Sequence, residues 1–312
     1  MSVQSPVSDT FFSAPPHFRW LVILYLFVGG ITGGALALGS LMRLVGRPED
    51  RPMVHLAAHL ALAGALMSGI ILSVDLALPL RFWHMVIQNH TGRPMFKAWS
   101  PMSVGVWGLM AFGFFALVAS LGAWGETGRS PWPPARAAAR PAVATAGAVG
   151  GLATGLFLAG YTGVLLAVSN RPIWSDSSWL GVLFLFSGIS TAIATLVLGA
   201  RWRDLRVPST VASLVRLDRI TLVLEAVTIV AFLISLGTVS RAFLNAWGVL
   251  LLLGVIGLGL LVPLAIERRA RDHAPPRVAL AAALVLVGGF LLRVVVPLSS
   301  DQVHVVGTQV LR

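Results

Sequence analysis

Long apolar stretches, separated by short polar and arginine-containing connections, run along the whole sequence. A helix needs about 20 mostly apolar residues to cross the hydrocarbon core of a bilayer. Each stretch of that length predicts one membrane-spanning helix, at residues 20–45, 54–78, 102–124, 141–168, 179–200, 213–236, 246–266 and 278–297. The pattern predicts an all-α integral membrane protein, a bundle of eight transmembrane helices over residues 20–297. Residues 1–19 and 298–312 are then polar tails.

Composition supports a membrane protein. Of the 312 residues, 56% are hydrophobic and 11% are charged, whereas a typical soluble domain carries roughly 25% charged residues. Such a sequence cannot hide its apolar surface in a soluble core, so lipid must be its solvent.

A net charge of +11 could indicate binding to nucleic acid. The distribution of the basic residues instead indicates how the helices are oriented in the membrane. Most Lys and Arg residues lie in the connections after the first, third, fifth and seventh predicted helices. Because such residues concentrate on the cytoplasmic side, we expect these connections to be cytoplasmic. Both termini then face the outer (periplasmic) side, and we expect no nucleic-acid partner.

The sequence has no cysteine, which excludes disulfides, thiolate catalysis and an iron–sulfur cluster ligated by this protein. Haem would need facing axial ligands, commonly histidines. His55 and His59 share one predicted helix, without a histidine at matching depth on another. We expect no haem and no metal site, so electrons, if the protein handles them, must come from a partner.

One group of polar side chains lies near the outer side of the predicted bundle. Hydroxyls at the mouth of a helical pocket can hydrogen-bond the carbonyls of a quinone, and a carboxylate there can exchange the proton of quinone chemistry. Alternatively, the tyrosines belong to the interfacial aromatic belt and Asp75 pairs with Arg81. The rise per residue places Tyr25, Tyr161 and Asp75 at similar depths. The group comprises Tyr25, Asp75, Tyr161, Asn170 and Arg171.

A second polar group faces the predicted cytoplasmic side. His55 and His59 lie four residues apart, on one helix face, and Asp218 and Glu225 lie seven apart, also on one face. Ionisable groups within spans default to a functional hypothesis, here a proton relay through Glu225, Asp218 and His59. Alternatively, Asp218 pairs with Arg219 or a loop arginine and the histidines line the headgroup region. Arg293, deep in the last predicted helix, needs a partner that the sequence does not name.

Small residues and connections complete the pattern. Glycine pairs four residues apart, at positions 29/33, 30/34 and 151/155, predict close helix packing. The partly amphipathic 79–101 connection predicts an interfacial helix or a docking surface for an extrinsic subunit. The proline-containing 124–140 connection predicts a flexible cytoplasmic linker.

Five segments together resemble the NrfD / polysulfide reductase membrane-subunit family. Their order and spacing across residues 18–190 carry the resemblance. They are Phe18–Gly34 (FRWLVILYLFVGGITGG), Asp75–Trp83 (DLALPLRFW), Ser100–Leu109 (SPMSVGVWGL), Tyr161–Trp174 (YTGVLLAVSNRPIW) and Phe184–Ser190 (FLFSGIS).

The resemblance implies a multi-pass subunit of a prokaryotic inner (plasma) membrane, without cofactor ligands of its own. It implies electron exchange between the quinone pool (menaquinone or ubiquinone) and a multi-cluster, ferredoxin-like iron–sulfur subunit. That subunit would sit beside a molybdopterin or multihaem catalytic subunit. Tyr161 matches the family's helix-four tyrosine and Asp75 its acidic residue. Tyr25 and Val22 fall where some members carry histidine and asparagine.

The leading hypothesis is therefore a quinone-binding subunit of a respiratory oxidoreductase, not catalytic alone, with proton translocation as a further prediction. A proton-coupled secondary transporter is the first alternative, because ionisable residues inside spans suit proton coupling. A purely structural membrane anchor is the second.

Overall fold

The computed structural model describes residues 20–300 except positions 77, 129–131, 170 and 270–274. The predicted tail at 1–19 lies outside this range, as do residues 301–312 of the predicted tail at 298–312, whose first two residues end the last helix. The described residues are almost entirely helical and contain no β-strand, only an isolated antiparallel bridge between Ile87 and Pro94. The predicted all-α class is confirmed.

Six long uninterrupted helices and two interrupted or irregular spans make up the described bundle. The long helices are α1 (Trp20–Val45), α2 (Arg51–Asp75), α3 (Pro101–Glu126), α5 (Pro141–Ala167), α6 (Leu180–Trp202) and α10 (Pro275–Ser299). One further span is α7 (Pro208–Ser235), followed by the 3-10 helix η4 (Gly237–Phe243). The other joins α8 (Ala246–Val249), the π-helix η5 (Leu250–Leu261) and α9 (Val262–Arg269). Short pieces are η2 (Pro48–Asp50), η3 (Pro79–Met85) and α4 (Pro133–Ala138).

In the described part of the sequence, seven helices are long and apolar enough to cross a membrane, and α7 with η4 makes an eighth when the bent pair counts as one span. The pair bends by 112°. α7 is the least apolar long helix because it carries Arg216, Asp218, Arg219 and Glu225. The predicted eight-helix bundle is confirmed, whereas which face is cytoplasmic stays a prediction.

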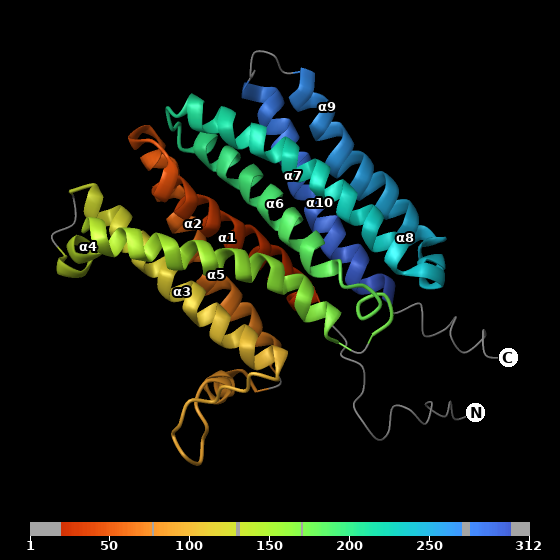
Figure 1. The fold of residues 1–312 in the computed structure, drawn as a ribbon, viewed down its shortest axis with the longest axis horizontal. Helices are drawn as coiled ribbons and strands as arrows, with labels where there is room; N and C mark the ends of the chain where they lie inside the picture. Colours follow the sequence, from red (N-terminus) through yellow and green to blue (C-terminus); the bar gives the residue numbers. More distant parts are fainter. Residues whose placement is uncertain (1–19, 77, 129–131, 170, 270–274, 301–312) are drawn as a thin grey trace.

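The bundle has two halves that share α6 (Figure 1). α1, α2, α3 and α5 pack together on one side, and α7, α10 and the α8–η5–α9 span pack together on the other. The last residues of α1, α3, α6 and α9 lie at one end of the bundle, here called the arginine-rich end. The first residues of α1 and the last residues of α2, α5 and α7 lie at the other, here called the tyrosine end.

Glycine lets α1 approach its neighbours closely. A methyl group at Gly33 would lie 2.8 Å from the Gly155 carbonyl oxygen of α5. A methyl group at Gly34 would lie 2.7 Å from the Gly188 carbonyl oxygen of α6. α1 therefore packs backbone to backbone on both helices, as the glycine spacing predicts.

The connections differ from the sequence expectation in detail. The 124–140 segment contains α4, whose Ala135 and Ala138 are buried against the end of α3, so it is not simply a flexible linker. The 79–101 segment contains η3, a short 3-10 helix with exposed Phe82 and Trp83, rather than an amphipathic α-helix. Proline at the start of η3 and the following bridge at Ile87 limit the helix to seven residues.

Candidate functional site

The two tyrosines lie close to one level of the contact between α1 and α5. Gly29 of α1 faces Thr162 of α5, because a methyl group at Gly29 would lie 3.4 Å from the Thr162 side chain. The Tyr25 ring lies beside the same glycine, and Tyr161 is the neighbour of Thr162. The Tyr25 ring and Tyr161 therefore lie close to one level, while the backbone of Tyr25 is about five residues, or ~7.5 Å, nearer the tyrosine end.

Tyr161 is fixed by α3. Its hydroxyl donates a 2.5 Å hydrogen bond to the Pro101 carbonyl oxygen, and its ring stacks on Phe157 with centroids 5.3 Å apart. Gly105, one turn further along α3, leaves the space for the hydroxyl, because a methyl group there would overlap it. The Tyr161 hydroxyl thus donates to the protein and keeps lone pairs that can accept a further hydrogen bond.

Tyr25 is different, because its hydroxyl has no hydrogen-bond partner among the described residues. The side chain is only 2% exposed, in the core shared by α1, α5 and α6. Within the described ranges, no side chain or backbone group forms a hydrogen bond with the Tyr25 hydroxyl. The Tyr25 hydroxyl therefore offers a donor that a ligand carbonyl can use.

Asp75 lies further out than the tyrosines. It is the last residue of α2 and is exposed. Gly64 of α2 faces Thr32 of antiparallel α1, and counting from this contact puts Asp75 about four residues, or ~6 Å, beyond the level of Tyr25. In the described part of the sequence no ion pair joins Asp75 to Arg81 and no hydrogen bond joins it to a tyrosine.

The connection after α5 carries the remaining residues of the predicted outer group. Asn170 lies outside the described residues. Arg171 is buried, stands over the Trp174 ring at 5.1 Å and donates a 3.1 Å hydrogen bond to the Ser300 hydroxyl after α10. Ile173 has a φ of 71°, which is rare for a β-branched residue. Strained backbone of this kind persists only where its surroundings hold it, often at functional sites.

The acidic residues of α7 face α6 within the bundle. Asp218 is buried and its Oδ1 accepts a 2.7 Å hydrogen bond from the Ser190 hydroxyl. Glu225, two turns further along α7, is also buried and faces Ser187 and Arg293. The alternative in which Asp218 pairs with Arg219 is wrong, because serine is its partner.

Arg293 is the centre of this buried network. Its guanidinium is 0% exposed and donates to the Leu26 carbonyl of α1 at 3.1 Å, to Ser187 of α6 at 3.0 Å and to the Gly289 carbonyl at 2.8 Å. Phenylalanine rings from α1 and α6 flank it. Gly30 makes room for Nη2, because a methyl group there would lie 2.5 Å from that nitrogen. Ser187 thus stands between Arg293 and the α7 carboxylate.

Glu267 of α9 is a functional candidate that sequence reasoning missed. It is buried and faces Arg219, with 3.8 Å between Nε and Oε2, and neither of these atoms has a hydrogen-bond partner among the described residues. Asp218 lies within electrostatic range of both Glu267 and Glu225. In the sequence, Glu267 is a single glutamate directly after the apolar stretch 246–266. Such a residue is typical of the end of any spanning helix, so it did not indicate a functional site.

The histidines lie apart from these acidic residues. His59 of α2 packs beside the Trp124 ring of α3, with centroids 6.1 Å apart, and no hydrogen bond or ion pair joins it to Asp218 or Glu225 in the described residues. His55 contacts Glu126 of α3, whose carboxylate accepts contacts from two arginines and this histidine. They are Arg43 at 2.5 Å, Arg51 at 2.9 Å and His55 at 2.9 Å.

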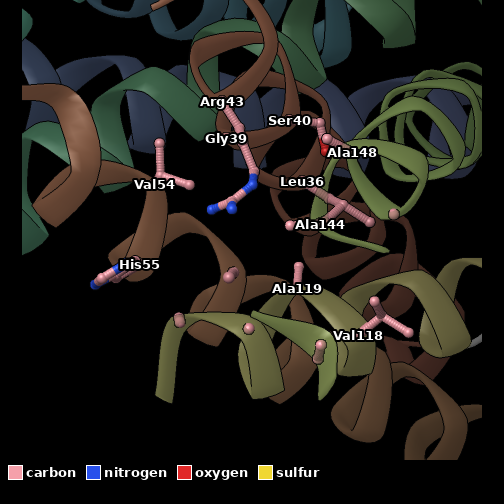
Figure 2. A pocket seen from close by; sticks show the side chains of 15 residues that line it. Leu36, Gly39, Ser40, Arg43, Val54, His55, Val118, Ala119, Ala144 and Ala148 are labelled. Carbon is pink, nitrogen blue, oxygen red and sulfur yellow. The ribbon is translucent and has the colours of Figure 1, made fainter. Parts of the chain in front are cut away.

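A small cavity of about 30 Å³ lies beside the Glu126 cluster, between α1, α2, α3 and α5. Figure 2 shows Arg43 reaching into it among mostly small apolar side chains. Such a volume holds one or two water molecules. Ala148 in its wall precedes Tyr161 by about 20 Å along α5, so this cavity is separate from the tyrosine level.

In the described ranges, no group of three or more His, Asp or Glu side chains is placed to hold a metal ion. The fold and the buried polar groups define a multi-pass helical membrane protein with ionisable side chains inside its bundle. Residues 10–304 match the family model described as polysulphide reductase, NrfD. The protein therefore belongs to the NrfD family, and the resemblance seen in its motifs is confirmed.

Two relatives illustrate the similarity. The sequence is 29% identical over 304 residues to a protein of Escherichia coli K12 named Protein NrfD. It is 26% identical over 297 residues to the C subunit of polysulfide reductase from Wolinella succinogenes. Each alignment covers 88% of this sequence and 92% of the relative, so the similarity extends over the whole bundle.

Proposed function

We propose that this protein is the quinone-binding membrane subunit of a respiratory oxidoreductase. It passes electrons between the quinone pool and an iron–sulfur partner subunit. Membership of the NrfD family supports this assignment, as does a relative whose name makes it one component of a polysulfide reductase. The observation that carries the site is the Tyr25 hydroxyl, which has no hydrogen-bond partner in the described residues and belongs to a buried side chain whose ring lies close to the level of Tyr161.

The tyrosine level suits a quinone chemically. Tyr25 donates a hydrogen bond to one ring oxygen, and Tyr161 accepts one from a quinol hydroxyl while its own proton stays directed at the Pro101 carbonyl. Arg171, next in sequence to Asn170, is buried in the connection that follows α5, where Trp174 and Ser300 hold it. Asp75 lies about one turn further out and takes up released protons at the exposed mouth.

Oxidation of one quinol releases two electrons and two protons. The electrons leave one at a time to an iron–sulfur cluster of the partner, because a protein without cysteine cannot ligate such a cluster itself. The partner is a multi-cluster, ferredoxin-like subunit that adjoins a molybdopterin or multihaem catalytic subunit.

Replacing Tyr25 with Phe tests the site, because the described residues offer the lost hydroxyl no protein partner whose bond would also be lost. In the purified complex, Tyr25→Phe should raise the KM for quinol several-fold, in line with one hydrogen bond of about 1 kcal/mol, and leave assembly intact. Thr154→Val is a matched control, since its hydroxyl bonds only the Gly150 carbonyl of its own helix. Equal kinetics for parent, Tyr25→Phe and control would refute the assignment.

Proton translocation is a second proposed activity, supported by the buried carboxylates. Glu267, Asp218 and Glu225 follow one another from the arginine-rich end toward the middle of the bundle, with Ser190 and Ser187 beside the last two. Such series of acidic groups are typical of proton paths in membranes. Glu267 replaces the expected His59 at the start of this path.

Glu225→Gln in a complex reconstituted into liposomes tests this second activity. We expect proton movement per electron to fall while quinol turnover is largely kept. His59→Gln, away from the acidic residues, should change neither. Parallel loss of proton movement and turnover in Glu225→Gln would argue against a separate proton path.

A further inference from the structure

A partly open groove of about 660 Å³ lies at the arginine-rich end of the second half of the bundle. The end of α6, the α6–α7 connection and the first turns of α7 and α10 form it. Its walls are aliphatic, and Val197, Ala200, Val207 and Val278 among them are buried. The volume is in the range of small-molecule sites.

Two arginines line this groove without a partner among the described residues. Arg201 and Arg206 are both exposed, and neither forms an ion pair or side-chain hydrogen bond with any residue that the structure describes. Asp204, also exposed, contributes a carboxylate to the same lining. The charged side chains of the lining therefore carry a net charge of about +1, which complements a single negative charge.

The depth of the groove matches the lipid headgroups. Trp202 follows Arg201 directly and is 88% exposed at the end of α6. Exposed tryptophans at helix ends are typical of the membrane–water interface. The arginines thus lie where headgroup phosphates occur, and the aliphatic walls continue toward the hydrocarbon.

We propose that this groove binds one anionic phospholipid, with its phosphodiester between Arg201 and Arg206 and the upper part of an acyl tail against Val197 and Val278. Basic pockets between spanning helices at this depth are suited to acidic headgroups. A free phosphate ion would satisfy the arginines but leave the aliphatic walls in water. A lipid satisfies both features with one molecule.

Native mass spectrometry of the purified complex tests the proposal, with phosphatidylglycerol added after delipidation and phosphatidylcholine as the neutral comparison. The double variant Arg201→Gln/Arg206→Gln should bind phosphatidylglycerol about thirtyfold more weakly, since each arginine near an anionic headgroup is worth roughly fivefold. Arg136→Gln/Arg140→Gln is the matched control, because both arginines lie at the same end but outside the groove. The control should bind like the parent.

Filling the groove provides a second, independent variant. Ala279→Phe keeps both arginines and the net charge but occupies the aliphatic part, so it should also lose phosphatidylglycerol. Equal binding by parent and double variant, or an equal loss in the control pair, would overturn the proposal. Displacement of the lipid by an equal concentration of inorganic phosphate would also overturn it, and would assign the groove to the free ion.

Discussion

Replacing Arg293 with Met should cost about 3–5 kcal/mol of unfolding free energy, by comparison with the loss of one of two buried, opposite charges, because Arg293 and Glu225 interact electrostatically across Ser187. The Leu26 and Gly289 carbonyls that Arg293 contacts belong to helices, so their own helical hydrogen bonds remain. The main loss is therefore the positive charge that Glu225 faces across Ser187.

A second substitution separates this charge effect from lost packing. Replacing a whole buried pair with neutral groups of similar volume is often close to neutral, so Arg293→Met/Glu225→Gln should recover most of the loss. The assay is reversible unfolding in mixed micelles titrated with sodium dodecyl sulfate, with Arg277→Met as an exposed control at the start of the same helix. A double variant whose loss is the sum of the two single losses would refute the electrostatic link between Arg293 and Glu225.

Three further substitutions test the packing and the ionic cluster. Gly105→Ala should displace the Tyr161 hydroxyl and cost about 1–3 kcal/mol in the same unfolding assay; an unchanged midpoint would contradict the close contact. In Gly64→Ala the added methyl group should overlap Thr32 and cost a similar amount of unfolding free energy. Adding Thr32→Ala should restore part of this stability, and a double variant that is no more stable than Gly64→Ala would contradict the overlap with Thr32. Glu126→Gln should cost about 1–2 kcal/mol at low salt and less at about 1 M salt, and a loss independent of salt would count against an electrostatic origin.

The spans were predictable because hydrocarbon demands long apolar runs, but their ends were less so. The predicted boundaries agree closely for α1 and α5, whereas α7 begins at Pro208 rather than at residue 213. Its first turns carry polar residues and Arg216, so they resemble a connection although the helix continues beyond the apolar stretch. The π-helix at Leu250–Leu261 could not be predicted from the sequence, because its residues are all apolar or glycine. Without polar positions, the sequence has no periodicity that would distinguish a π-helix from an α-helix.

Depth within a helix could be predicted, but neighbours could not. Counting the rise per residue placed Tyr25 and Tyr161 at similar depths, and the contact between Gly29 and Thr162 puts their backbones about five residues, or ~7.5 Å, apart along the bundle, with the Tyr25 ring reaching back to Gly29. The i, i+4 spacing placed His55 and His59 on one face of α2 but gave no information on which helix that face meets. It meets α3, with Glu126 and Trp124, rather than α7.

Arg293 shows most clearly what lies beyond a single sequence, because its partners are 106 and 267 residues away. It also joins the two polar groups that the sequence presents as separate. Its Nε bonds the carbonyl of Leu26, the residue after Tyr25, and its Nη1 bonds the serine that faces Glu225. Leu26 directly follows Tyr25 on α1, so a ligand that shifts the α1 backbone at Tyr25 would also change the hydrogen bond to Arg293. A shift of that guanidinium would change the electrostatic field at Glu225, so quinone binding as proposed at Tyr25 would have a short physical route to the carboxylates of α7.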